Sequence, residues 1–314
     1  MKKLFIVFMT VVMVLSVTLL SGCGKTENTV ADTGSEIEST VSETVETSDS
    51  TEQKPVVLVV SFGTSYNDTR EKTIGAIENK IAEDYPEYEV RRAFTSQTII
   101  DKLKKRDNLE IDNVEGAFER LVSDGVKKVV VQPTHLMSGY EYDDLTAVFD
   151  QYKSKFEKAA MGKPLLTSDE DLTKVASALP EITKDYNTEG TAVIFMGHGT
   201  EHDSNEVYVK LQEKLNAAEA NNYYIGTVEA SPSLDDMVSA AKEGGYSKVV
   251  LEPLMVVAGD HANNDMAGDE DDSWKSVFEK EGFEVECVLQ GLGEFEEIQK
   301  IYSDHVGEAI SSLN

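Results

Sequence analysis

Three side chains that commonly bind metal ions follow apolar runs of this sequence: His198, Glu229 and His261. The runs that precede them are residues 191–196, 223–228 and 248–252. Ligands of open α/β sheets bind beyond the carboxyl ends of the strands, so we expect the three side chains to meet there. Two imidazoles and one carboxylate suit cobalt, nickel, iron or zinc. The pattern therefore indicates a transition-metal site, although each of these residues taken alone is more often an ordinary hydrogen-bonded or solvated group.

Glycines adjoin both histidines, in Gly197-His198-Gly199 and in Gly259-Asp260-His261. Glycine lets the backbone turn sharply, which presents each imidazole to whatever occupies the space beyond the strands. A neutral imidazole holds a cation without cancelling its charge and can take up a proton near neutral pH. A carboxylate beside it can orient the ring or receive a proton itself. These properties fit a site that both binds and releases a metal.

Other polar residues have simpler explanations. His202 lies four residues after His198 at the start of a predicted helix, where a capping or supporting role is expected. His305 belongs to the last amphipathic stretch and is expected to be an ordinary core or surface residue. The acidic run 269–272 is explained as negative charge at a helix N-terminus. Three arginines are candidates to meet substrate carboxylates, the alternative being solvated pairs with the many acids: Arg70, Arg91 and Arg92.

His135 is a separate candidate, for a cofactor. It follows Pro133 at the end of a predicted strand, and Met255 holds the matching position after a second, similar strand. Histidine and methionine can both ligate haem iron, so His135 is a candidate haem ligand. The alternative is a histidine that simply packs at the protein surface.

Short apolar runs alternate with amphipathic stretches from residue 55 to the end of the chain, which is the βαβ pattern of a parallel sheet covered by helices. The clearest buried strands are residues 56–61, 128–132, 191–196 and 248–252. Within residues 69–84, three isoleucines fall on one face of a predicted helix. Ser96 is a plausible N-cap for the next helix.

The sequence also resembles itself. VVSFGTSYND (59–68) matches IFMGHGTEHD (194–203), and DGVKKVVVQP (124–133) matches GGYSKVVLEP (244–253). Chance similarity between βα units would explain either pair alone, but two pairs in the same order favour duplication. We therefore expect an α/β fold of two similar lobes, residues 55–165 and 166–314, each a parallel sheet flanked by helices. An active-site cleft would lie between the lobes, and the C-terminal helix is a candidate to pack back on the first.

The N-terminus has the pattern of a secretory signal: MKK, then apolar residues 4–20, then Leu-Ser-Gly before Cys23. A membrane-spanning helix is the alternative, but the run is at the short end for a bilayer. The Leu-Ser-Gly-Cys sequence resembles the lipobox of bacterial lipoproteins, which implies removal of residues 1–22 and lipid on Cys23. Residues 23–54 hold no aromatic residue and many acids, so they are predicted to form a disordered tether. The protein would be exported, on the outer face of the cytoplasmic membrane or in the periplasm.

Composition excludes several other functions. The formal net charge is −29, and no basic stripe is present to hold a phosphate backbone, so nucleic acid is not an expected partner. Once Cys23 carries lipid, Cys287 is the remaining cysteine, so no intrachain disulfide or thiolate cluster can form. Cys287 lies in the strand-like run 284–289, where a buried, unreactive thiol is expected. A homo-oligomer is compatible with the sequence, which does not define the oligomeric state.

Several segments resemble the anaerobic sirohydrochlorin cobaltochelatases, the class II chelatases that need no ATP. They are MGHGTEHDSN, VEASPS, EPLMVVAGDHANNDMAGDEDDSWKS and, in the first lobe, QPTHLMSGYEYDDL. The similarity spans residues 55–314. It implies that His198 and His261 bind Co²⁺ with Glu229 beside them, and that Glu141 occupies the acidic position of the GxEY loop. Glu141 follows Gly139 by two residues as His261 follows Gly259, so we expect Glu141 to lie opposite His261.

The resemblance implies insertion of Co²⁺, or of Ni²⁺, Fe²⁺ or Zn²⁺, into a tetrapyrrole such as sirohydrochlorin. In agreement, the chain has no GxxxxGK[ST] nucleotide loop. Export raises an alternative, because the intermediates of corrin synthesis are cytoplasmic. The alternative is a surface lipoprotein that binds or carries haem, another metallotetrapyrrole or a metal ion in the same cleft.

Overall fold

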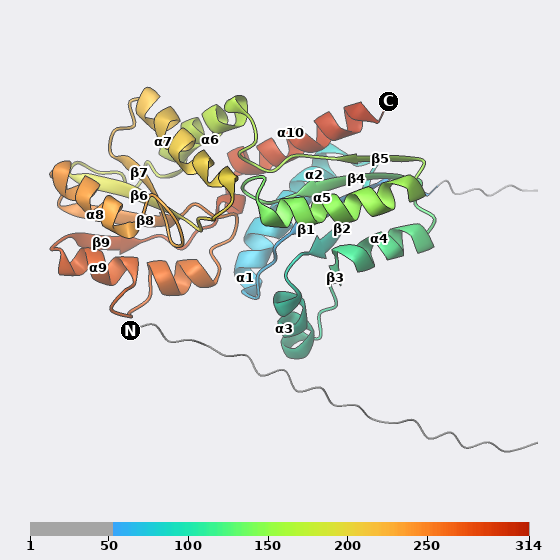
Figure 1. Cartoon of the computed structure of the whole chain (residues 1–314), viewed down its shortest axis with the longest axis horizontal. Helices are drawn as coiled ribbons and strands as arrows, with labels where there is room; N and C mark the ends of the chain where they lie inside the picture. Colours follow the sequence, from blue (N-terminus) through green and yellow to red (C-terminus); the bar gives the residue numbers. More distant parts are fainter. Residues whose placement is uncertain (1–52, 314) are drawn as a thin grey trace, which may run out of the picture. The chain divides into compact units, whose positions relative to one another are not determined.

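Two parallel sheets flanked by helices make up the part of the chain that the computed structural model describes, residues 53–313 (Figure 1). This architecture confirms the predicted α/β class. The predicted signal and lipid site, and nearly all of the predicted tether, lie outside the described residues.

The first sheet has five strands in the order β3-β2-β1-β4-β5. Its strands are β1 (Val56–Ser61), β2 (Glu89–Phe94), β3 (Asp112–Asn113), β4 (Lys128–Pro133) and β5 (Lys158–Met161). The helices of this lobe are α1 (Asn67–Arg70), η1 (Glu71–Gly75), α2 (Ala76–Asp84), α3 (Gln97–Asp107), α4 (Val114–Ser123), α5 (Tyr140–Tyr152) and η2 (Lys153–Lys155).

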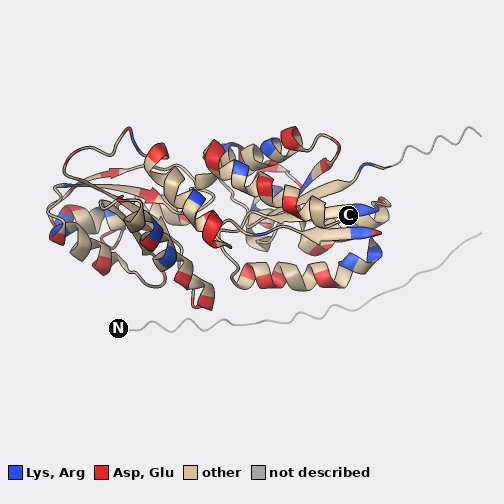
Figure 2. Cartoon of the chain, turned by 90° about the horizontal axis from the view of Figure 1, so that it is seen from above, with Lys and Arg blue, Asp and Glu red and all other residues tan. Residues whose placement is uncertain are grey.

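The second sheet has four strands in the order β7-β6-β8-β9. Its strands are β6 (Thr191–Gly197), β7 (Tyr223–Thr227), β8 (Lys248–Pro253) and β9 (Glu284–Cys287). The helices are α6 (Asp169–Ile182), η3 (Asp203–Asn205), α7 (Glu206–Ala217), α8 (Leu234–Glu243), η4 (Ala262–Met266), α9 (Trp274–Lys280), η5 (Leu292–Glu294) and α10 (Glu296–Ser312). Figure 2 shows that Asp and Glu residues are distributed along the helices of both lobes.

The predicted strands and the first predicted helix are confirmed. All residues of β1 and β6 are buried, as expected of central strands in a sheet covered on both faces. The helix predicted over 69–84 begins two residues earlier and continues through α1, η1 and α2, and the isoleucines of its apolar face are buried: Ile74, Ile77 and Ile81. The Ser96 hydroxyl accepts a hydrogen bond from the Ile99 amide, which is the predicted N-cap of α3.

The two sheets share their central topology, because β2-β1-β4-β5 and β7-β6-β8-β9 follow the same connections. Beyond the strand ends, the Ser96 amide donates to the Phe62 carbonyl just as the Glu229 amide donates to the His198 carbonyl. Phe62 of the first lobe therefore corresponds to His198 of the second. The match read from the sequence was one residue out of register, since it set Gly63 against His198.

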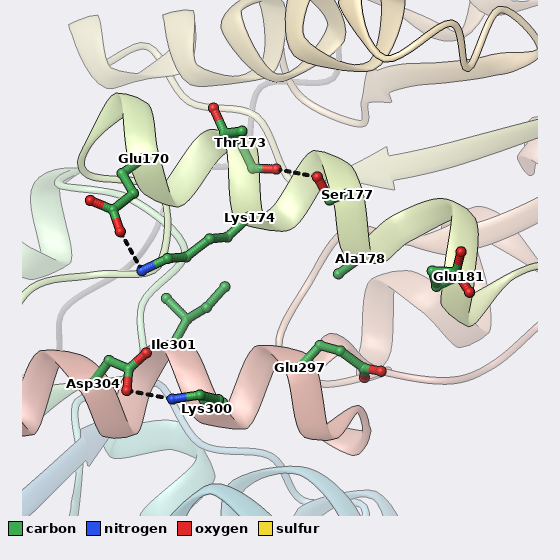
Figure 3. A pocket seen from close by; sticks show the side chains of 10 residues that line it. All are labelled: Glu170, Thr173, Lys174, Ser177, Ala178, Glu181, Glu297, Lys300, Ile301 and Asp304. Atoms are coloured by element: carbon green, nitrogen blue, oxygen red, sulfur yellow. Dashed lines mark hydrogen bonds and ion pairs between the residues drawn. The ribbon is translucent and has the colours of Figure 1, made fainter.

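Helix α10 follows the second sheet along the chain but packs on α2, β4 and β5 of the first lobe as well as on α6. The Tyr302 hydroxyl donates to the Thr134 carbonyl at 3.0 Å, and the His305 ring bonds to buried Asp171 of α6 at 3.1 Å. A groove of about 670 Å³ lies between α6 and α10, and ion pairs within each helix border it (Figure 3). The boundary between residues 165 and 166 stays a prediction.

Candidate metal centre

The sequence around His198 is dictated by close packing at the end of β6. A Cβ atom on Gly197 would stand 2.3 Å from the Tyr208 ring. Gly199 has φ +84°, and a Cβ there would stand 2.8 Å from the Ala230 amide nitrogen. Both positions thus require glycine. The His198 Nδ1 lies 2.7 Å from the Gly199 carbonyl and can donate to it, which leaves Nε2 with its lone pair exposed.

Glu229 is placed by backbone pairing that continues past β6 and β7. Its amide donates to the His198 carbonyl at 2.9 Å, and its Oε1 lies 3.9 Å from the His198 Nε2. The loop beyond it is held by Asn205, whose amide group donates to the Ser231 carbonyl at 2.8 Å and accepts from the Thr200 amide at 3.0 Å. Neighbouring strand ends therefore fix the spacing of His198 and Glu229.

His261 is the N-cap of η4, in the loop that follows β8. Its Nδ1 lies 2.7 Å from Oδ2 of Asp265, one helical turn later. A carboxylate at Nδ1 fixes the ring orientation and makes the other ring nitrogen a better metal donor. Asp265 was not among the residues predicted from the sequence, although GDHANND contains the spacing His-x-x-x-Asp.

The structure brings the three sequence-predicted ligands together. One ligand atom from each of His198, Glu229 and His261 lies within 4.8 Å of the others. The two imidazole rings stand nearly perpendicular, with their centroids 4.6 Å apart. All three side chains keep contact with solvent, with exposed fractions of 49%, 57% and 35%. A metal bound by these side chains would therefore be accessible from solvent. The metal-ligand role of the three residues stays a prediction.

Glu141 lies in the first turn of α5, on the first lobe. Loss of solvation raises the pKa of its carboxyl, the neighbouring His198 lowers it, and Asp144 raises it. Tyr208 lies near both Glu141 and His198. Its hydroxyl accepts a hydrogen bond from the Gly199 amide at 3.2 Å. Burial raises the pKa of this hydroxyl to about 12, and the Glu141 carboxylate also raises it. Glu141 of the first lobe is therefore near His198 of the second, and its catalytic role stays a prediction.

The remaining histidines are explained by their surroundings. His202 caps η3, because its Nδ1 accepts from the Ser204 amide at 3.0 Å, and its Nε2 lies 3.4 Å from Asp143 of the first lobe. The predicted capping role is confirmed. His305 is 2% exposed and paired with Asp171, so it is a core residue.

His135 is buried rather than packed at the surface, with 8% of the residue exposed. Neither ring nitrogen has a hydrogen-bond partner among the described residues, and burial lowers the pKa of the imidazole to about 4. Both nitrogens are inaccessible in this arrangement. Ligation of haem iron by His135 stays a prediction, and it would require the side chain to move.

Most of the other candidates form ion pairs. Arg91 pairs with Glu89 and Asp124, and Arg92 pairs with Glu78, so for these two the solvated-pair explanation holds. Within the acidic run 269–272, two residues pair with lysines of α9: Asp269 with Lys275 and Asp271 with Lys280. Burial raises the pKa of the Cys287 thiol to about 11, which fits the expected unreactive thiol. None of the three candidate ligands lines the groove between α6 and α10.

Two parallel α/β lobes, with a cluster of two histidines and one glutamate beyond the strand ends of the second sheet, define a two-lobed α/β protein with a candidate metal site. A comparison with known protein families identifies the class of protein more narrowly than the fold does. A family model described as cobalt chelatase (CbiK) matches residues 55–311. The chain belongs to this family of cobalt chelatases.

Curated relatives agree with this assignment. The chain is 37% identical over 258 residues to the sirohydrochlorin cobaltochelatase of Salmonella typhimurium, a match that covers 82% of this chain and 97% of the relative. It is 34% identical over 263 residues to the sirohydrochlorin cobaltochelatase CbiKC of Nitratidesulfovibrio vulgaris, covering 83% and 92%.

A solved structure shows the same fold at lower identity. SirB from Bacillus subtilis with Fe³⁺ matches with a TM-score of 0.58 and 16% identity, covering 83% of this chain and 97% of SirB.

Proposed function

We propose that this protein is a sirohydrochlorin cobaltochelatase, which inserts Co²⁺ into the ring without a nucleotide. The observation that carries the proposal is the cluster of His198, Glu229 and His261 at the strand ends of a chain in the cobalt chelatase family. The curated relatives of that name support the ring substrate.

The three side chains receive the metal. Both imidazoles use Nδ1 in local hydrogen bonds, to the Gly199 carbonyl and to Asp265, so Nε2 of each is the donor available to Co²⁺. Glu229 supplies one negative charge, and neutral imidazoles release the ion more readily than a set of carboxylates would. The same set of donor atoms can also bind Ni²⁺, Fe²⁺ or Zn²⁺, so the metal that is inserted depends in addition on which ions are available to the protein.

Insertion exchanges one Co²⁺ for two protons, which leave the pyrrole nitrogens of the ring. A carboxylate with a raised pKa is a good acceptor near neutral pH, and Glu141 has this property on the lobe opposite the metal ligands. Glu141 takes the two protons from the ring one after the other and passes each to solvent before it accepts the next. The metal and the proton acceptor thus act from opposite sides of the ring.

A turnover assay with the full chain, sirohydrochlorin and Co²⁺ tests the proposal through the change in ring absorbance. His198→Ala and His261→Ala should each abolish most insertion with the fold retained, because both residues lie in loops beyond the sheet. Parental turnover and stoichiometric Co²⁺ binding in the double variant would refute the site. No insertion by the parent chain would refute the function.

We also propose that the protein acts outside the cytoplasm, attached through lipid on Cys23. The signal-like residues 1–22 and the Leu-Ser-Gly-Cys sequence support this proposal. Among residues 53–313, no helix is both long and apolar enough to cross a bilayer. Cys23→Ser should prevent incorporation of labelled palmitate and release the protein from the membrane fraction, and unchanged fractionation would contradict the anchor.

A further inference from the structure

Arg70 differs from the other arginines of the chain in its partners. Arg91, Arg92, Arg106 and Arg120 each pair with at least one carboxylate. Arg70, at the end of α1, has no carboxylate oxygen within the 4.0 Å of an ion pair in the part of the chain that the structure describes. An arginine left without an acid is notable in a protein that carries a net charge of −29.

Neutral acceptors hold the Arg70 guanidinium instead. Its Nη1 donates to the Asn67 side-chain oxygen at 3.0 Å and lies 3.4 Å from the Thr64 carbonyl. Arg106 of α3 donates to the same Asn67 oxygen and to the Ser65 carbonyl, both at 2.7 Å. Two guanidinium groups are thus gathered on one short loop, with Asp107 as the single carboxylate paired to Arg106.

Three guanidinium groups lie near one another here, although Arg92 and Arg106 each pair with an acid. Burial lowers the pKa of Arg70 most, the nearby Arg92 and Arg106 lower it further, and Asp107 and Glu71 raise it. Like charges brought together at a partly desolvated place are unfavourable unless an anion joins them. An arginine fork matches a carboxylate through two parallel hydrogen bonds.

The same loop borders the metal site. Phe62, at its start, corresponds to His198 in the second lobe and is 49% exposed. The Tyr66 hydroxyl lies 3.5 Å from Asp260, the residue before His261, and the Thr64 hydroxyl lies 3.9 Å from where a Cβ on Gly259 would stand. The loop that precedes Arg70 therefore lies beside the segment that carries His261.

We propose that Arg70, supported by Arg106, binds a peripheral carboxylate of the tetrapyrrole and so sets the position of the ring relative to the metal. The inference rests on the proposed function, because it requires an acidic ring between the lobes. Arg70 acts as a positioning and specificity residue, while the metal ligands and Glu141 remain the catalytic groups.

The test compares full-length Arg70→Gln and Arg70→Lys with Arg120→Gln, a matched charge change at an arginine that is 63% exposed and paired with Asp112. The measurements are KM and kcat with sirohydrochlorin, and metal-free binding of uroporphyrin, which has eight carboxylates, and of coproporphyrin, which has four. Arg70→Gln should raise KM and weaken uroporphyrin binding by about tenfold, with a smaller effect on kcat. Arg70→Lys should recover part of the loss, and Arg120→Gln should match the parent chain.

Carboxylate recognition also predicts a smaller loss for coproporphyrin than for uroporphyrin, and unchanged Co²⁺ binding in both Arg70 variants. If Arg70 had only a structural role, its replacement would weaken uroporphyrin, coproporphyrin and Co²⁺ binding together and would also lower the melting temperature. Parental KM and parental uroporphyrin affinity in Arg70→Gln would overturn the inference, as would an equal loss in Arg120→Gln. If Arg70→Gln does not fold, the same comparison is made with Arg70→Lys and Arg106→Gln, and parental values in both overturn it. Failure of the parent chain to metallate sirohydrochlorin would instead overturn the proposed function.

Discussion

The Asp265 carboxylate holds the imidazole of His261 in the candidate metal site. Asp265 holds Nδ1 of His261 at 2.7 Å, one helical turn away. The sequence predicted His261 as a ligand because this histidine follows a glycine turn at the end of a predicted strand. It could not assign Asp265 alone, because eight acids lie in residues 260–281 and only the turn of η4 brings one of them to His261.

Asp265→Ala is expected to lower Co²⁺ affinity about 10- to 100-fold, the range typical of carboxylates that orient a metal-binding histidine. Calorimetric titration of Co²⁺ measures the effect. Asp304→Ala is the matched control, since Asp304 forms an exposed ion pair with Lys300 on α10. Equal Co²⁺ affinity in both variants would show that Asp265 does not support the site.

Glu252 is expected to make the stability of the fold depend on pH, whereas the equivalent residue of the first lobe carries no titratable group. It is fully buried on β8, its Oε2 accepts from the Tyr186 hydroxyl, and its Oε1 has no partner among the described residues. Burial raises the pKa of its carboxyl to about 7. Gln132 holds the matching place on β4, which shows that an uncharged amide fits.

A folded-state pKa above the unfolded value means that the native protein holds the proton more tightly. The contribution of Glu252 to stability is therefore full below about pH 4.5 and is lost as the pH rises to about 7. Glu252→Gln should be nearly neutral at pH 4 and should stabilise the fold by about 3 kcal/mol at pH 8. Urea unfolding at the two pH values measures this, and an equal effect at both would contradict the assignment.

At the scale of elements, the sequence predicts strands better than it predicts their ends. Apolar runs located β1, β4, β6 and β8 because central parallel strands are buried on both faces. β3 could not be found, since two residues, Asp112 and Asn113, carry no pattern. The repeat was found but aligned one residue out, because only hydrogen bonds beyond the strands show that Phe62 corresponds to His198.

Gly199 tests whether the turn after β6 positions His198. Gly199→Ala places a methyl group at φ +84° and 2.8 Å from the Ala230 nitrogen, so it should cost about 1–3 kcal/mol and abolish most Co²⁺ insertion. Gly245→Ala is the control, because Gly245 has φ +70° with nothing within 4 Å of the added atom. It should cost only about 1 kcal/mol, from strain, and retain activity.

Thermal unfolding and turnover assays separate these effects. Similar destabilisation of the two variants with parental activity in both would show that the close approach of Gly199 to Ala230 does not position the imidazole.

At the scale of the molecule, one cluster of buried apolar residues joins the two lobes, while each lobe also has apolar clusters of its own. A single cluster of buried apolar residues includes Val57 and Val59 of the first sheet, Val193 and Phe195 of the second, and Ile301 of α10. The pair of His305 and Asp171 adds a buried link between α10 and α6. The sequence predicted two parallel sheets, but it could not show that side chains from both would join one apolar cluster.

A truncated chain that begins at Lys54 should therefore be soluble and should melt in a single transition, because unfolding either lobe would expose the cluster that also supports the other. Calorimetry measures this, with the calorimetric and van't Hoff enthalpies expected to agree. Added Co²⁺ should raise the one melting temperature, since it binds the folded state alone. Two resolved transitions, of which Co²⁺ shifted only one, would mean that the lobes unfold independently and that α10 does not couple them.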